Sequence, residues 1–166
     1  MKFAGIAHKV GSDVNTDLII SGRYKFKTLD DKELAKHVME DLDPEFYKKL
    51  SPGDFIVAGR NFGCGSSREQ APLAIKYAGV SAVIAESFAR IFFRNAVNIG
   101  LPVVECKEAG KIAEGDELDV DLEAGIIRNK AKGFELTVKP LPDFMVKILS
   151  DGGLVAHFRK YGGFSI

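Results

Sequence analysis

The stretch DFIVAGRNFGCGSSREQAPLAIKYAGVSAVIAE, residues 54–86, decides the fold. It opens with a short apolar run at 54–58, passes through a glycine-rich loop, and enters a helical pattern at 69–79 that Gly79 ends. A second apolar run follows at 81–86. A strand, a loop, a helix and a second strand in this order are typical of βαβ units with a parallel sheet. The loop then lies at the carboxyl end of a strand, where open α/β sheets bind their ligands.

The flanking sequence continues this alternation and then changes its period. Helices and strands alternate up to residue 106, and apolar residues with glycine turns then recur with period two, which predicts antiparallel strands. The further expected elements are strands at 2–10 and 101–106, helices at 28–42 (capped by Thr28 or Asp30) and 87–100, antiparallel strands within 115–141, and short helices within 142–153 and from 154 onward. We therefore expect an α/β fold with a small parallel sheet and added antiparallel strands, forming a single domain over residues 1–166.

Composition and charge exclude several classes of function. The chain has 166 residues and a formal net charge of zero, so the sequence predicts no nucleic-acid partner and no anionic membrane surface. Its most apolar stretch, 80–104, is interrupted by charged residues such as Glu86 and by Pro102, which argues against a membrane span. The N-terminal residues show no secretory apolar region, so a cytoplasmic location is the expectation.

The cysteines and histidines show no metal-binding pattern. Cys64 and Cys106 form no C-x-x-C pair, and neither has metal-ligand spacing to His8, His37 or His157. A disulfide between the two cysteines is not expected in a reducing compartment. We therefore expect no metal site on this chain.

The glycine-rich loop at 63–69 allows four interpretations. As a dinucleotide fingerprint it has the first two glycines around Cys64, but Arg68 replaces the third. As a phosphate-binding P-loop it lacks the G-K-[ST] ending. As a nucleophile, Cys64 has no histidine base nearby in sequence. The fourth interpretation is an anion-binding site with a hydroxyl base.

Four features of the loop favour anion binding. Ser66 and Ser67 precede a helix, whose N-terminus offers free N–H groups and positive potential. Arg68 adds a planar fork that suits a carboxylate, and the glycines let a ligand approach the backbone. A helix that contains Pro72 begins at Glu69 or later, which leaves both serines in the loop. A plain strand–loop–helix connection with ordinary caps fits the same spacing equally well.

The segment NFGCGSSREQAPLAIKYAGVSAVIAESFARIFFRNAVNIGLPVV, residues 61–104, resembles the signature region of the swivel domain of the aconitase superfamily. The segment DVNTDLIISGRY, residues 13–24, is similar to a second motif of that family. The resemblance covers essentially the whole chain, whose length is similar to that of free-standing small subunits in the isopropylmalate dehydratase group. It implies a swivelling domain of three layers, β/β/α.

The same resemblance implies that this chain is one of two different subunits of an enzyme. The partner would be a large subunit that carries a [4Fe–4S] cluster on its own cysteines, in a heterodimer or heterotetramer. The implied reaction is hydro-lyase chemistry, the reversible dehydration of a dicarboxylic or tricarboxylic 2-hydroxy acid. For the isopropylmalate enzymes this reaction moves a hydroxyl group between adjacent carbons in leucine biosynthesis.

The family's functional residues fall on particular positions of this sequence. The catalytic serine of the family matches Ser66, which would remove the proton alpha to a carboxylate. Ser67 and Arg68 would hold a substrate carboxylate. Asp17 matches a family acid that supports hydrogen bonding in the active site, and Thr16 beside it is a further substrate-contact candidate.

The segment that would select the substrate follows the second motif. It reads Arg23, Tyr24, Lys25, Phe26 and Lys27, and all five are substrate-binding candidates. Phe26 would suit an isopropyl group, whereas Arg23 or a lysine would suit a third carboxylate. The Lys-Phe-Lys run matches neither the apolar version expected for isopropylmalate nor the arginine-bearing version expected for homoaconitate. Homoaconitase and methylmalate hydro-lyase activities therefore stay open, and a non-enzymatic carboxylate- or nucleotide-binding module is the remaining alternative.

Overall fold

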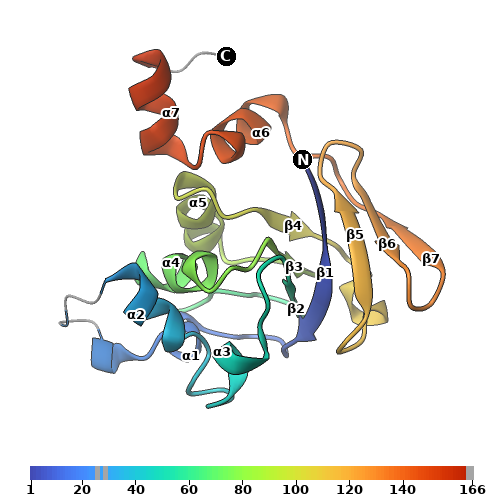
Figure 1. Cartoon of the computed structure of the whole chain (residues 1–166), viewed down its shortest axis with the longest axis horizontal. Helices are drawn as coiled ribbons and strands as arrows, with labels where there is room; N and C mark the ends of the chain where they lie inside the picture. Colours follow the sequence, from blue (N-terminus) through green and yellow to red (C-terminus); the bar gives the residue numbers. More distant parts are fainter. Residues whose placement is uncertain (25–26, 28–29, 164–166) are drawn as a thin grey trace.

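The structure, a computed structural model, describes residues 1–24, 27 and 30–163 and contains one mixed seven-stranded sheet in the order β4-β3-β2-β1-β5-β6-β7 (Figure 1). The strands are β1 (Lys2–Lys9), β2 (Phe55–Ala58), β3 (Ala82–Ala85), β4 (Val103–Glu105), β5 (Glu117–Asp121), β6 (Ile126–Asn129) and β7 (Phe134–Thr137). β1 to β4 pair in parallel, whereas β5, β6 and β7 pair antiparallel, with β5 also antiparallel to β1. The expected parallel sheet with added antiparallel strands is confirmed.

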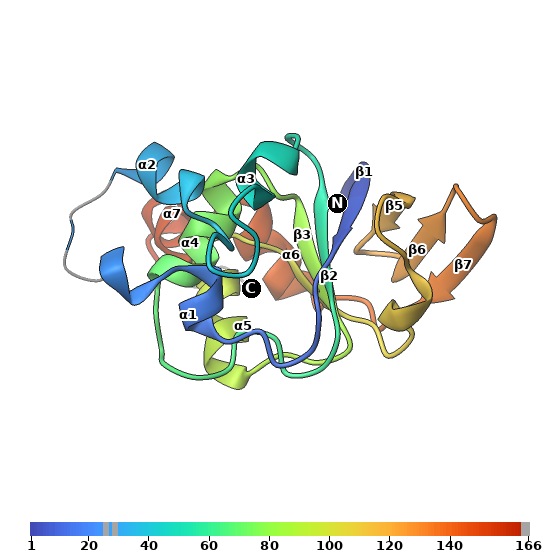
Figure 2. The same cartoon turned by 90° about the horizontal axis from the view of Figure 1, so that it is seen from below.

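The helices gather on one side of the parallel strands, opposite β5, β6 and β7 (Figures 1 and 2). They are α1 (Thr16–Ile19), α2 (Asp31–Lys36), α3 (Phe46–Lys49), α4 (Gln70–Tyr77), α5 (Arg90–Asn98), α6 (Asp143–Ser150) and α7 (Leu154–Tyr161), with the 3₁₀ turn η1 (Gly22–Tyr24). The second 3₁₀ turn, η2 (Ala109–Lys111), packs on the side of the antiparallel strands, where Ala109 shares a core with Leu118. No helix among these described residues is long and apolar enough to cross a bilayer.

Alternate side chains of the parallel strands enter two different cores. In β2, Ile56 points into the core beneath the helices, whereas Phe55 and Val57 point into a second core. That second core is closed by side chains of the antiparallel half, such as Leu118 and Ile127. The sheet therefore curls so that its two halves face each other, which gives the expected layer sequence of helices, parallel strands and antiparallel strands.

The expectation of one continuous helix over 28–42 is wrong. Asp30 caps the helix through its side chain, which accepts from the Glu33 N–H at 2.8 Å, but α2 ends at Lys36. Met39 has a positive φ of 56° and its N–H donates to the Ile19 carbonyl at 2.8 Å. The chain leaves the helical path here because that backbone bond and the complete burial of Met39 join it to the end of α1.

Local structure departs from the sequence pattern at three further points. The segment from Asn15 contains the short helix α1, capped by the Asn15 side chain, and the turn-rich region before β2 contains α3; neither helix was expected. α5 begins only at Arg90, because residues 87–89 run extended beside the glycine-rich loop. α4 begins at Gln70, as the position of Pro72 predicts, and Glu69 makes no side-chain cap.

Candidate active site

The glycine-rich loop after β2 lies between two other chain segments. On one side the Gly63 N–H donates to the Val14 carbonyl at 2.8 Å and the Thr16 N–H donates to the Cys64 carbonyl at 2.9 Å. On the other side the Phe62 carbonyl accepts from the Ala89 N–H at 2.9 Å. Backbone hydrogen bonds from both neighbours therefore fix the loop, although it has no regular secondary structure of its own.

Gly63 allows the loop to approach α5. Its φ is 78°, and a Cβ at this position would lie 2.2 Å from Cγ of Phe92, a buried aromatic side chain on α5. Gly65 also has a positive φ, 88°, but a Cβ there would meet ordinary contacts at 3.5 Å or more. Both residues need the left-handed conformation that glycine adopts at low cost, and Gly63 also needs the absence of a side chain.

Ser66 and Ser67 are exposed at the end of this loop. The Ser66 carbonyl accepts from the Thr16 hydroxyl at 2.8 Å and from the Arg68 N–H at 2.9 Å, so its peptide group is held from both sides. Thr16 is itself buried. The predicted substrate-contact residue Thr16 thus positions Ser66 from below, and both serine side chains face outward.

Arg68 and Asp17 form an ion pair across the site. Nη2 of Arg68 lies 2.5 Å from Oδ1 of Asp17, and Nη1 donates to the Ile20 carbonyl at 3.4 Å. The Arg68 side chain is only 16% exposed, whereas Asp17 is 57% exposed. The two predicted site residues therefore meet, and the Asp17 carboxylate orients the guanidinium of Arg68.

A pocket of about 310 Å³ opens beside these residues. Its walls come from α1, from the glycine-rich loop, and from the start of α5. The lining residues are Thr16, Gly63, Gly65, Ser66, Ser67, Arg68, Ala89, Arg90, Ile91, Phe92 and Asn95. Two arginines, two serine hydroxyls and one asparagine therefore face the same cavity, which is a lining that suits a small anionic ligand.

The predicted specificity segment lies further from this pocket. Tyr24 stacks on His37 with ring centroids 4.1 Å apart, and its hydroxyl donates to Oε1 of Glu40 at 2.7 Å. Burial and this hydrogen bond raise the pKa of the Tyr24 phenol. Arg23 pairs with Glu40 and Asp41, and Nζ of Lys27 lies 5.6 Å from the Tyr24 ring centroid.

Lys25 and Phe26 lie outside the described residues. Arg23 and Tyr24 contact residues after α2, whereas Lys27 contacts Tyr24, and none of the three lines the pocket beside Ser66. Arg68 and Tyr24 do share a second, much smaller hollow, which brings the specificity segment within reach of the site.

Metal ligands do not come together in the part of the chain that the structure describes. No three side chains of histidine, cysteine, aspartate or glutamate are grouped there as a metal site. Cys106 is buried, which raises the pKa of its thiol, and Cys64 is half-buried in the loop. These residues do not fit an iron–sulfur cluster.

Sequence reasoning missed the contribution of α5 to the pocket. Arg90, Ile91 and Asn95 line it, and none of the three is among the site residues expected from the sequence. The usable signal was topological: the carboxyl ends of adjacent parallel strands lie at one edge of a sheet, so the segment after β3 is brought beside the loop after β2.

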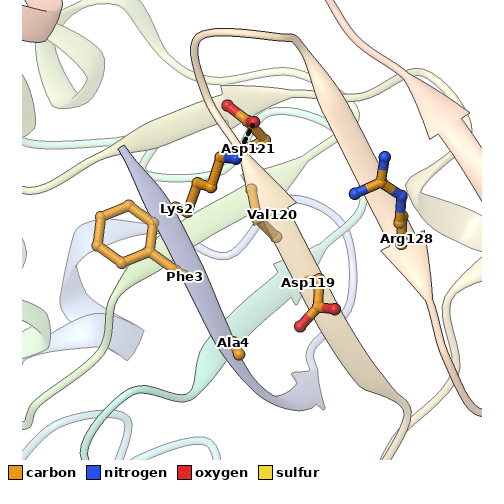
Figure 3. Close-up of a pocket in the computed structure, with 7 residues that line it drawn as sticks. All are labelled: Lys2, Phe3, Ala4, Asp119, Val120, Asp121 and Arg128. Carbon is orange, nitrogen blue, oxygen red and sulfur yellow. Dashed lines mark ion pairs between the residues drawn. The ribbon is translucent and has the colours of Figure 1, made fainter.

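Another hollow, on the antiparallel half, has the same volume as the pocket beside Ser66, about 310 Å³, and lies over β1, β5 and β6 (Figure 3). It is lined by Lys2, Phe3, Ala4, Asp119, Val120, Asp121 and Arg128. Its two cationic side chains are matched by two aspartates, and Lys2 pairs with Asp121 at 3.6 Å. Because these charges balance, this hollow is less suited to binding an anion than the pocket beside Ser66.

The fold and the loop are those of a known class. The family of the aconitase C-terminal domain matches residues 11–109, which include the loop, α4, α5 and the Asp17 region. The chain therefore belongs to the aconitase C-terminal domain family.

Full-length similarities narrow this class to its dehydratase small subunits. Small subunit 2 of 3-isopropylmalate dehydratase from Archaeoglobus fulgidus is 59% identical over the whole of both chains. The methanogen homoaconitase small subunit of Methanothermobacter thermautotrophicus is 57% identical, covering 94% of this chain and 90% of its own length. The crystal structure of a 3-isopropylmalate dehydratase from Methanocaldococcus jannaschii superimposes with a TM-score of 0.93 at 48% identity, covering 98% of this chain and 96% of the other.

Proposed function

We propose that this chain is the small subunit of a 3-isopropylmalate dehydratase, which interconverts 2-isopropylmalate and 3-isopropylmalate by dehydration and rehydration in leucine biosynthesis. The observation that carries the proposal is the pocket in which Ser66, Ser67 and Arg68 lie together at the carboxyl edge of the parallel strands. The identity of 59% to a curated subunit with that name supports the same reaction.

Ser66 is the proposed base. As an alkoxide it would take the proton from the carbon alpha to a substrate carboxylate, the C–H electron pair would form the C=C bond, and the hydroxyl group on the adjacent carbon would leave as hydroxide. The proton held by Ser66 and this hydroxide together account for the water that is lost. Two observations support this role. The Ser66 side chain is exposed, and the Ser66 carbonyl accepts two hydrogen bonds, so the hydroxyl is presented on a fixed backbone. Positive potential from Arg68 would stabilise the serine alkoxide.

Ser67 and Arg68 are the proposed carboxylate clamp. Arg68 offers a planar fork of N–H donors, which binds a carboxylate through two parallel hydrogen bonds. Asp17 already orients that fork at 2.5 Å, so its proposed role is to hold Arg68 and, through it, the hydrogen bonding of the site. Thr16 supports the site from below through its bond to the Ser66 carbonyl.

The remaining half of the site would come from a large subunit, in a heterodimer or heterotetramer. We infer that this partner carries a [4Fe–4S] cluster, which would act as the Lewis acid for the leaving hydroxyl group. Among the described residues no three potential metal ligands are grouped, and the proposal assigns the cluster to the partner subunit.

A homoaconitase small subunit is the second candidate, and a methylmalate hydro-lyase is a further variant of it. The similarity of 57% to the methanogen homoaconitase subunit favours homoaconitase, as do the lysines of the segment Arg23, Tyr24, Lys25, Phe26 and Lys27. These lysines would meet the additional carboxylate of a tricarboxylic substrate. Steady-state rates of the assembled enzyme on isopropylmalate, homocitrate and a methyl-substituted malate will rank the candidates.

The decisive experiment uses this chain assembled with a cluster-loaded large subunit of the same family. Each subunit alone should show negligible dehydratase activity, and the assembled pair should be active. Ser66→Ala should lower kcat by about 10²- to 10⁴-fold, the usual contribution of a positioned base. Ser150→Ala, at the exposed end of α6, is the matched hydroxyl control and should leave kcat unchanged. Full activity of Ser66→Ala would remove Ser66 from the role of base.

A further inference from the structure

The first turn of α5 places an arginine in the wall of the pocket. Arg90 is the first residue of α5 and lines the cavity that Ser66, Ser67 and Arg68 also line. Arg90 and Arg94, which is one helical turn later, are both exposed, but Arg94 does not belong to the lining. The two arginines look equivalent in the sequence, but the structure separates them: Arg90 faces the candidate active site and Arg94 does not.

Arg68 and Arg90 differ in whether their positive charge is paired with a carboxylate. Arg68 is paired with Asp17, so part of its positive charge is already offset. Arg90 forms no ion pair with any of the residues that the structure describes. The pocket therefore contains one guanidinium that is partly offset by a carboxylate and one that is not, and a dicarboxylic ligand brings two negative charges.

The backbone around Arg90 adds to this positive potential. The N-terminal neighbour Ala89 provides no side-chain cap for α5, a helix of nine residues. The first N–H groups of α5 thus carry the positive end of the helix dipole at the same wall of the pocket. Asn95 lines the cavity from the second turn and contributes a neutral hydrogen-bonding group.

We propose that Arg90 is a substrate-binding residue that takes the second carboxylate of a dicarboxylic substrate, opposite the carboxylate held by Arg68. The inference rests on the proposed function, because it assigns Arg90 within the same site. Arg90 and Arg68 then bind the two ends of the substrate, and Ser66 and Ser67 line the same pocket. The role of Arg90 is binding and orientation, and it moves no proton.

The test compares Arg90→Gln, Arg90→Lys and the matched control Arg94→Gln in the assembled enzyme. Loss of a charged hydrogen bond predicts a rise of about 10- to 100-fold in KM for Arg90→Gln, with kcat changed far less. Arg90→Lys should fall between the wild type and Arg90→Gln, because an ammonium keeps the charge and loses the fork. Arg94→Gln should keep KM within about twofold, as expected for an exposed charge away from the site.

Two competitive inhibitors separate carboxylate binding from general damage. Malate has two carboxylates and lactate has one. Arg90→Gln should weaken inhibition by malate about tenfold or more and leave inhibition by lactate unchanged, because only malate presents a second carboxylate. Equal weakening of both inhibitors, or an unchanged KM, would overturn the role assigned to Arg90.

Assembly and wild-type activity complete the experiment. If Arg90→Gln weakens binding of the large subunit while KM is normal at saturating large subunit, Arg90 is an interface residue and the proposal is overturned. An active wild-type pair with an unaffected Arg90→Gln variant rejects only this inference. An assembled, cluster-loaded wild-type pair without any activity rejects the proposed function itself, so the two failures are distinguishable.

Discussion

The parallel and antiparallel halves of the sheet bury their strands differently. All four residues of β2 and of β3 are buried, because helices cover one face and the curled antiparallel half covers the other. In β5 the buried residues alternate with more exposed ones, because only one face meets a core. The parallel half is thus enclosed on both sides, and the antiparallel half acts as a cover with one solvated face.

The same difference decides where the candidate active site lies. Parallel strands are followed by loops and helix starts at one edge of the sheet, and both the loop after β2 and the start of α5 meet there. The antiparallel strands β5, β6 and β7 are joined by tight connections. The hollow over that half has balanced charges (Figure 3). We therefore expect changes in the two halves to separate effects on activity from effects on stability.

The largest effect is expected for Gly63→Ala, at the contact between the loop and α5. The new Cβ would combine a positive φ with overlap against Phe92, and should lower the free energy of unfolding by about 3 kcal/mol. Gly65→Ala is the matched control, since it has a similar φ and no close contact, and should cost about 1–2 kcal/mol. Chemical denaturation measures both, and equal losses would contradict the contact.

A smaller effect is expected for Asp54→Ala, which breaks the bonds that join β1 to the start of β2. The buried Asp54 carboxylate accepts from the N–H groups of Ile6 and Ser51 and from Nε2 of His8, the last at 2.7 Å. Removing this acceptor should cost about 2 kcal/mol at neutral pH, because buried donors lose their partner. Thermal and urea unfolding measure the loss.

The contribution of Asp54 to the free energy of unfolding should depend on pH. Burial alone would raise the pKa of Asp54, but the bonds from Ser51, Ile6 and His8 hold it below its ordinary value. The stabilisation is therefore fully present above the unfolded-state pKa of about 4 and is lost as pH falls through the lower folded-state value. The stability difference between wild type and Asp54→Ala should shrink under acid conditions. A difference that stays constant below that pH would contradict this assignment.

A smaller effect still is expected for Ile127→Val in the core beneath the antiparallel half. Ile127 is fully buried there, and the loss of one methylene should cost about 1 kcal/mol of unfolding free energy. Because none of the residues that line the candidate site pocket belongs to the core that contains Ile127, kcat and KM of the assembled enzyme should stay at wild-type values. A change in KM would show that the cover and the site are coupled.

The smallest effect is expected for Asp121→Asn on the solvated face. Its partner Lys2 lies 3.6 Å away and is 82% exposed, and exposed ion pairs contribute about 0–1 kcal/mol. Hydrogen bonds from the N–H groups of Glu123 and Ala124 to Asp121 can be kept by the amide oxygen. Unfolding free energy and kinetics of the assembled enzyme should both stay close to wild type, and a marked change in KM would assign a function to the hollow in Figure 3.

The sequence by itself determined the alternation of strands and helices and the position of the loop. Apolar runs such as 54–58 are readable because a strand buried on both faces must be continuously apolar. The late start of α4 was readable from Pro72, since proline is tolerated only in the first turn of a helix. The interpretation of the loop's serines and arginine as an anion-binding set also came from the sequence, because their chemistry is local, and it stays a prediction.

Only the tertiary structure decided which distant residues share the site. The break of α2 depends on a bond from Met39 to Ile19, and the orientation of Arg68 depends on Asp17, about fifty positions away in sequence. Arg90 and Arg94 have the same chemistry and are one turn apart, yet only Arg90 reaches the pocket. Periodicity reports which residues lie on one face of an element, but the direction of that face is set by how the elements pack.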